Sequence, residues 1–266
     1  MAAAVPRSLG RPEDVLAKAA RENFPVALFV LPRETRRRLA DVYGFARLVD
    51  DAGDLAEGNR EELLDWIEAD LERGEHPLIA RVRDLPRGPL LRLIEANRQD
   101  QRVSRYPRFE ELVAYCDLSA NPVGELVLHA FGAATAERVR WSNSICTGLQ
   151  LAEHWQDVGE DRRAGRIYLP LEDLERFGVS EQLEPGEPFR QLMAFEVERA
   201  REVLREGLPL VRSLHGRQRL AVAAFAGGGF AALDAVEGSG YDVLQRTPRA
   251  GKAGRLLWTG RVWRGA

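Results

Sequence analysis

The stretch LADVYGFARLVDDAGDL, residues 39–55, has apolar residues at helical spacing and contains three aspartates near its end. One face of the predicted helix carries Leu39, Val42, Tyr43, Ala46, Val49 and Asp50. Apolar residues that recur after three or four positions are typical of a helix that packs one face against a core. Pro32 suits the first turn of this helix, because a proline there loses no hydrogen bond. The stretch therefore predicts a helix that ends near Gly53 and carries carboxylates in its last turns.

The same period dominates the rest of the chain, and signals for β-strands are nearly absent. A helix is expected from Asn59 to Gly74, and short helices are expected after Pro77 and after Pro89. Further helices are expected over about 108–120, 135–158, 171–177, 187–214 and 217–236. Pro122 should kink or break the helix that begins near residue 108. We expect one all-α domain over residues 1–266, with residues 1–10 and 247–266 at its periphery and the basic end as an irregular tail.

Composition narrows the class of protein. The chain has 266 residues, 45% of them hydrophobic, and its net charge of −3 gives no support for nucleic-acid binding. Cys116 and Cys146 form no C-x-x-C pair, so neither a disulfide framework nor a thiolate metal site is expected. We find no signal peptide and no run of about 18 apolar residues that would span a membrane. A soluble, cytoplasmic protein is therefore expected.

A second set of acidic residues repeats the spacing of the first, in LQLAEHWQDVGED, residues 149–161. Its members are Glu153, Asp157 and Asp161, with Gln150 nearly one turn before them. Residues four apart lie on the same face of a helix, one turn from each other, and Asp50 and Asp54 share this relation. The chain thus presents two rows of carboxylates on two helices.

Facing rows would be unstable without counter-charge, because two carboxylates about 4 Å apart repel by roughly 1 kcal/mol even in water. Mg²⁺ prefers oxygen ligands and usually combines one or two carboxylates with water and substrate phosphates. Facing rows would therefore suit a diphosphate bridged by Mg²⁺ ions. The alternative is that both rows face solvent, as aspartates on helices usually do. No Lys or Arg follows these carboxylates at a distance of four residues, which favours the metal-diphosphate interpretation.

Four stretches in order resemble the squalene/phytoene synthase family. YGFARLVDDAGD (43–54) resembles its first aspartate-rich motif, and GLQLAEHWQDVGEDRRAGRIYLP (148–170) resembles its second. ENFPVALFVLPRETRRRLADVYGFAR (22–47) and YCDLSANPVGELVLHAFG (115–132) are similar to its N-terminal and middle segments. The resemblance runs from about Asn23 to Tyr241 and is strongest to the bacterial hydroxysqualene synthase branch.

The resemblance implies an isoprenoid-synthase-type helical bundle with a central cavity, and two or three Mg²⁺ ions. The implied metal ligands are Asp50, Asp51, Asp54, Glu153, Asp157 and Asp161, and the implied catalytic residues are Arg47, Asp50, Asp54, Asp157 and Asp161. The candidates for substrate binding are Asn23, Phe24, Tyr43, Arg47, Tyr115, Gln150, Gln156, Arg166, Tyr168 and Tyr241. For Tyr115 a place in the hydrophobic core is an equal alternative.

Two positions depart from the family pattern. Glu153 stands where the second motif normally has a metal-binding Asn, and Gln156 stands where Arg is frequent. Glutamate is still an oxygen ligand but adds charge, and the loss of Arg removes a donor to phosphate. Arg162, Arg163 and Arg166 lie nearby and could restore positive charge.

The hydroxysqualene branch implies ionisation of presqualene diphosphate, rearrangement of the carbocation and capture by one water molecule. No nicotinamide is implied, and no G-x-G-x-x-G follows a predicted strand. The expected partners are a prenyl diphosphate substrate, enzymes of the squalene pathway and the inner face of a membrane, although no strongly amphipathic anchor is evident.

Three alternatives stay open. A sister activity would condense two farnesyl or geranylgeranyl diphosphates head to head to presqualene diphosphate, squalene or phytoene. A chain with Glu153 and Gln156 could also bind a prenyl diphosphate or a partner enzyme without turnover. A ferritin-like di-metal protein is disfavoured, because the Glu-x-x-His pattern on paired helices is missing.

Overall fold

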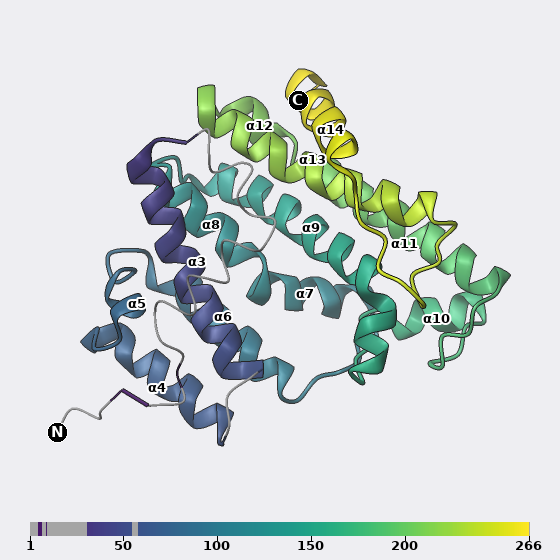
Figure 1. Cartoon of the computed structure of the whole chain (residues 1–266). Helices are drawn as coiled ribbons and strands as arrows, with labels where there is room; N and C mark the ends of the chain where they lie inside the picture. The colour runs from purple at the N-terminus through teal and green to yellow at the C-terminus, as the bar shows by residue number, and fades with distance from the viewer. Residues whose placement is uncertain (1–4, 7–8, 10–30, 55–57, 266) are drawn as a thin grey trace. The chain divides into compact units, whose positions relative to one another are not determined.

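The computed structural model describes residues 5–6, 9, 31–54 and 58–265, and over these ranges the chain forms helices and no β-strand (Figure 1). The all-α class expected from the sequence is confirmed. The chain divides into two compact units, one of residues 1–102 and 118–135 and one of residues 103–117 and 136–266. That both belong to a single domain stays a prediction.

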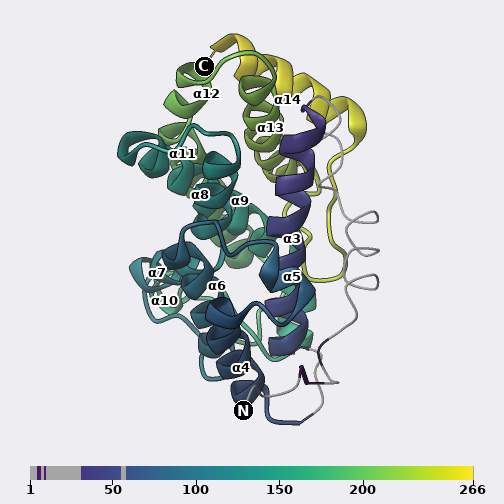
Figure 2. The same ribbon diagram turned by 90° about the vertical axis from the view of Figure 1, so that its left-hand side faces the viewer.

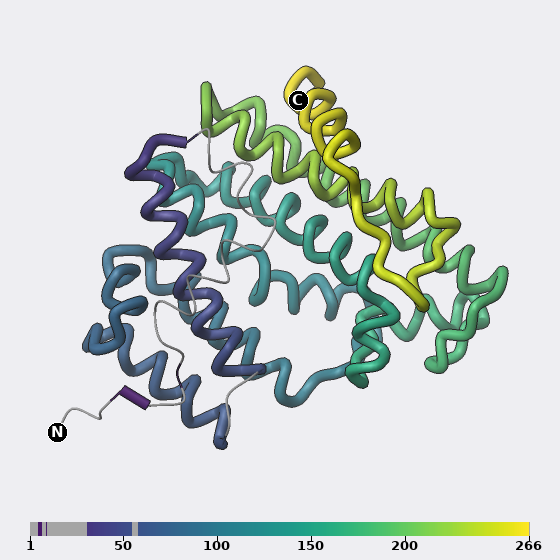
Figure 3. The backbone as a smooth tube through the Cα atoms, in the orientation of Figure 1, coloured from purple at the N-terminus to yellow at the C-terminus, as the bar shows by residue number. Residues whose placement is uncertain are grey.

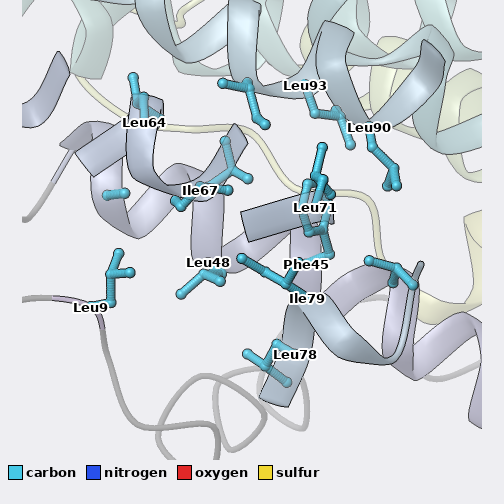
Figure 4. Packing of buried hydrophobic residues seen from close by; sticks show 14 of the residues in the cluster. Leu9, Phe45, Leu48, Leu64, Ile67, Leu71, Leu78, Ile79, Leu90 and Leu93 are labelled. Carbon is cyan, nitrogen blue, oxygen red and sulfur yellow. The ribbon is translucent and has the colours of Figure 1, made fainter. Parts of the chain in front are cut away.

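The first unit is arranged around α3. Its helices are α3 (Arg33–Asp54), α4 (Arg60–Arg73), α5 (Pro77–Ala80), α6 (Arg87–Asp100) and α8 (Asn121–Ala130). α3 packs against each of the other four. Phe45 and Leu48 lie in a hydrophobic core with leucines and isoleucines of α4, α5 and α6 (Figure 4). Burial of this face fixes the rotation of α3 and so the direction of the residues in its last turns.

The second unit is arranged around α9. Its helices are α9 (Ala136–Arg163), α10 (Leu171–Phe177), α11 (Glu187–Glu206), α12 (Pro209–Ser213), α13 (Gly216–Gly238), α14 (Lys252–Gly265) and most of α7 (Phe109–Ser119). α9 packs against α11, α12 and α13, and α14 lies alongside α13 (Figures 1 and 2). Figure 3 shows the backbone leaving α13, running through the connector of residues 239–251 and entering α14.

Most predicted helix boundaries are confirmed, because local signals set them. Asn59 caps α4 by accepting a hydrogen bond from the backbone N–H of Glu62, and Gly74 ends α4 with a φ of 69°. Pro122 stands in the first turn of α8, so a new helix begins at Asn121 as expected.

Three predictions about helices are wrong. α6 is not short but has 14 residues. The segment 187–214 forms two helices, since Pro209 cannot continue α11 and instead occupies the first turn of α12. The basic end of the chain is helical rather than irregular, because α14 packs along α13.

α13 departs from the expectation that no run of the chain is long and apolar enough to span a membrane. Among the described residues it is the one helix long and apolar enough to cross a membrane by length and composition, and 56% of its apolar window is buried inside the protein. Contacts with α9, α11 and α14 account for this composition, because a helix packed on several sides needs apolar residues around most of its circumference.

Candidate active site

The last turns of α3 carry the acidic residues of the first motif. Asp50 and Asp54 are exposed, whereas Asp51 is largely covered. Arg47 Nε lies 2.9 Å from Asp51 Oδ1, one turn along the helix. No basic residue follows these carboxylates by four positions, but Arg47 precedes Asp51 by four. Arg47 thus neutralises Asp51, whereas Asp50 and Asp54 are the carboxylates of this row that reach solvent. Tyr43 lies one turn before Arg47 on the same helix.

Two amides, Asn97 on α6 and Gln101 directly after its last residue, hold this end of α3 in place. Asn97 is 6% exposed, and its Nδ2 donates to Asp50 Oδ1 at 3.2 Å. Gln101 Nε2 donates to the backbone oxygen of Gly53 at 2.9 Å. A Cβ at Gly53 would lie 2.2 Å from Asn97 Oδ1, so a glycine is required for this close approach. α6 therefore fixes both the backbone and one carboxylate of the first acidic row.

The Asp50 carboxylate carries an unfavourable charge. Although its side chain reaches solvent, surrounding protein atoms restrict its hydration and raise its pKa to about 6. The hydrogen bond from Asn97 lowers the pKa, and the charge of Asp54 raises it further. A cation beside Asp50 and Asp54 would relieve both the desolvation and the repulsion.

The second acidic row lies on α9. Glu153 is exposed, and Asp157 and Asp161 are half-buried. Burial raises the pKa of both aspartates, and the charge of Asp157 helps to raise that of Asp161 to about 7. Asp157 Oδ1 is buried and accepts no hydrogen bond from any residue that the structure describes. A divalent cation would satisfy this oxygen and neutralise its neighbour, so the donor set of this row fits Mg²⁺.

Trp155 sets the rotation of α9. Its side chain is fully buried, and its indole Nε1 donates to the backbone oxygen of Glu196 on α11 at 3.1 Å. Trp155 lies two residues from Glu153 and two from Asp157. With the indole directed into the core, these acidic residues are directed away from α11.

The connector of residues 239–251 lies along the C-terminal half of α9. Gly159 N donates to the backbone oxygen of Val243 at 3.2 Å, and a Cβ at Gly159 would lie 2.3 Å from the backbone oxygen of Leu244. The Gln156 amide donates to the backbone oxygen of Pro248. The predicted substrate residue Gln156 therefore holds the connector to α9. Tyr241, at the start of the connector, is half-buried with a φ of 61°.

An aromatic cluster adjoins the second row. His154 stacks on Tyr168 with ring centres 3.7 Å apart, and Tyr115 lies 6.0 Å from Tyr168 and is 5% exposed. Burial lowers the pKa of His154 to about 3, so the neutral ring accepts at Nε2 from Gln150 Nε2 at 3.2 Å. His154 thus packs inside the unit.

A small cavity connects this cluster with the acidic row. Its polar lining consists of His154, Asp161, Arg166 and Tyr168, and its volume of about 10 Å³ is room for one water molecule. Arg166 Nη1 lies 3.1 Å from the Tyr168 hydroxyl. Asp161, Arg166 and Tyr168, all from the second motif, therefore line one cavity.

The structure thus describes the predicted site as two separate groups, one in each unit. Asn23 and Phe24 lie outside the described residues. Within the described ranges no three acidic, histidine or cysteine side chains gather closely enough to hold an ion by themselves. That the two acidic rows face each other stays a prediction, as does the role of each ligand.

Four residues that support the site were not predicted from the sequence. They are Asn97, Gln101, Trp155 and Gly159. A single amide on an ordinary helix has no distinctive spacing, so nothing marked Asn97 or Gln101. The position of Trp155 inside the second acidic row was the one available signal, because a large apolar residue there must be directed into the core.

Comparisons with known proteins identify the family. The squalene/phytoene synthase family model matches residues 17–255. The crystal structure of squalene synthase HpnC from Alicyclobacillus acidocaldarius has 38% sequence identity and a TM-score of 0.80, and the match covers 86% of this chain and 94% of that one. A hydroxysqualene synthase from Rhodopseudomonas palustris is 36% identical over 59% of this chain and 58% of its own length. A phytoene synthase from Mycobacterium tuberculosis is 30% identical over 80% of this chain and 76% of its own length. The chain therefore belongs to the squalene/phytoene synthase family and has its isoprenoid-synthase helical fold.

Proposed function

We propose that the chain converts presqualene diphosphate to hydroxysqualene, in the formation of squalene and hopanoids. The observation that carries this proposal is the second acidic row, where the buried Asp157 Oδ1 has no donor among the described residues and lies one turn from Asp161, whose pKa is raised to about 7. This arrangement suits a metal-bound diphosphate. The similarity to the squalene synthase HpnC and to hydroxysqualene synthases supports this particular reaction.

Asp50 and Asp54 of α3, together with Glu153, Asp157 and Asp161 of α9, would hold the metal ions. Members of the family depend on divalent metals and bind prenyl diphosphates. Bound Mg²⁺ would supply electrophilic stabilisation of the negative charge that develops on the departing diphosphate. Asn97 orients Asp50 for this task, and Trp155 orients the row on α9.

The reaction balances without an external oxidant or reductant. The carbon–oxygen bond to diphosphate breaks, and its electron pair leaves with the diphosphate. After rearrangement, the oxygen of one water molecule forms a new bond to the carbocation and releases a proton. Such a cation needs an apolar, aromatic surrounding that admits little water. Tyr168 and Tyr115, which pack beside the α9 row, are suited to this surrounding.

A second candidate is the head-to-head condensation of prenyl diphosphates. It is favoured by the phytoene synthases, whose similarity at 30% identity extends over 80% of this chain. Both reactions require the same acidic residues, because both begin with the departure of diphosphate.

The test is product analysis with purified chain and Mg²⁺, given either presqualene diphosphate or farnesyl diphosphate. The proposal expects hydroxysqualene from presqualene diphosphate and no product from farnesyl diphosphate alone. Turnover of farnesyl or geranylgeranyl diphosphate alone would favour the condensation. Binding of both diphosphates without any product would favour a chain that binds without turnover.

A further inference from the structure

The C-terminal segment differs in charge and exposure from the rest of the chain. Residues 243–266 contain six of the chain's basic residues and no acidic residue, whereas the whole chain has a net charge of −3. Leu256 and Leu257 of α14 are 69% and 52% exposed. Among the described residues the remaining exposed large hydrophobic side chain is Val5, at 39%. Within the part of the chain that the structure describes, two adjacent exposed leucines in a basic segment are therefore found in α14.

α14 is held firmly on α13, so the leucines have a fixed direction. Trp258 stacks on Phe230 with ring centres 4.7 Å apart, and its Nε1 donates to Asp234 Oδ2 at 2.6 Å. A Cβ at Gly227 would lie 2.7 Å from the backbone nitrogen of Thr259, so the two helices touch at their backbones. α13 and α14 lie side by side in both views (Figures 1 and 2).

The two leucines lie on the face of α14 that is turned away from α13. Trp258 marks the face of α14 that contacts α13. Around the helix axis, Leu256 is rotated by about 160° and Leu257 by about 100° from Trp258. Lys252, Arg261 and Arg264 are also exposed and flank the leucines along the helix. Apolar residues thus occupy both sides of α14, so the helix has no single apolar stripe, and the sequence analysis found no amphipathic anchor.

We propose that the outer face of α14 docks on a lipid bilayer that contains anionic headgroups. The leucines enter the boundary between headgroups and acyl chains, and the basic side chains lie at the negatively charged surface. Charge complementarity decides the occupant, because a second copy of this face would bring basic side chains against basic side chains. The inference is independent of which prenyl diphosphate the chain uses.

The experiment is sedimentation of the full chain with two kinds of vesicles. One kind is phosphatidylcholine alone, and the other is two parts phosphatidylcholine to one part phosphatidylglycerol. The variants are Leu256→Gln with Leu257→Gln, and separately Lys252→Gln with Arg264→Gln. Val5→Gln controls for the loss of an exposed apolar residue elsewhere. Arg87→Gln with Arg102→Gln, on the first unit, controls for the loss of two exposed charges.

We expect binding to the anionic vesicles that weakens as salt is raised, and little binding to phosphatidylcholine. Each α14 variant should lower the partition coefficient about tenfold, while the controls stay near the wild type. Circular dichroism should show unchanged folding, and the charge variant tests the proposal even if the leucine variant is unstable. Absence of binding, or equal binding by all variants, would overturn the proposal. A change from dimer to monomer in the leucine variant, without a change in vesicle binding, would assign the face to a second copy instead.

Discussion

The amide of Asn97 allows a direct test of how α6 supports the first acidic row. Asn97→Ala removes the donor to Asp50 Oδ1 at 3.2 Å and the bond to the backbone oxygen of Leu93 at 3.3 Å. Hydrogen bonds to charged groups contribute about 1.5–3 kcal/mol, and a bond of this length belongs at the lower end. If the variant loses about 1.5 kcal/mol of the free energy that holds Asp50 in its metal-binding orientation, the affinity for Mg²⁺ should fall about tenfold.

The assay is the Mg²⁺ concentration that gives half-maximal release of diphosphate from a prenyl diphosphate. Gln101→Ala is the matched control, because it removes a bond from the C-terminal cap of the same helix to the Gly53 backbone and touches no carboxylate. We expect Asn97→Ala to raise the half-saturating Mg²⁺ concentration about tenfold. Gln101→Ala should leave it within about twofold of wild type while lowering the Tm to a similar extent.

Two results would refute this reasoning. Equal shifts in the two variants would show that α6 acts only through the stability of α3. An unchanged half-saturating concentration in Asn97→Ala would mean that Asp50 needs no orientation for metal binding. The free energy of unfolding, measured in parallel, separates these outcomes from simple loss of fold.

Three further predictions concern the second unit. Glu153→Asn should keep its turnover rate within a factor of a few of wild type, because an amide oxygen can still bind Mg²⁺; complete loss of turnover would show that the charge of Glu153 is required. Gly159→Ala should lower the free energy of unfolding by about 1–3 kcal/mol in urea denaturation, since its Cβ would lie 2.3 Å from the Leu244 backbone oxygen; an unchanged value would mean that the connector does not lie on α9. Glu196 is fully buried, and burial raises its pKa to about 8. The stability that its protonated form contributes is therefore complete below the pKa that Glu196 has in the unfolded chain, and it is lost as the pH rises through 8. Between pH 7 and pH 9 the wild type should therefore lose about 1.4 kcal/mol more of its free energy of unfolding than Glu196→Gln; equal losses would contradict this pKa.

Local signals explain which parts of the fold could be predicted. The bounds of α4 follow from Asn59 and Gly74, and the start of α8 follows from Pro122. The division into two units has no such signal, because the chain passes between them three times without a linker rich in glycine or proline. α14 was missed because its apolar residues lie on two opposite faces, which removes the usual periodicity.

That the acidic residues of each row share one helix could be predicted, because a helix repeats its faces at fixed spacing. Their surroundings could not, since Asn97 approaches Asp50 only through the packing of α6 on α3. The ion pair between Arg47 and Asp51 shows the same limit. The resemblance to the family implied both residues as candidates, but only the structure shows that they neutralise each other.

The central claim is that both acidic rows serve one site for a metal-bound diphosphate. Isothermal titration calorimetry of inorganic diphosphate, with and without Mg²⁺, tests it most directly. The account predicts binding that requires Mg²⁺ and that is lost both in Asp50→Asn, on α3, and in Asp157→Asn, on α9. Binding without Mg²⁺, or undiminished binding in either variant, would contradict it.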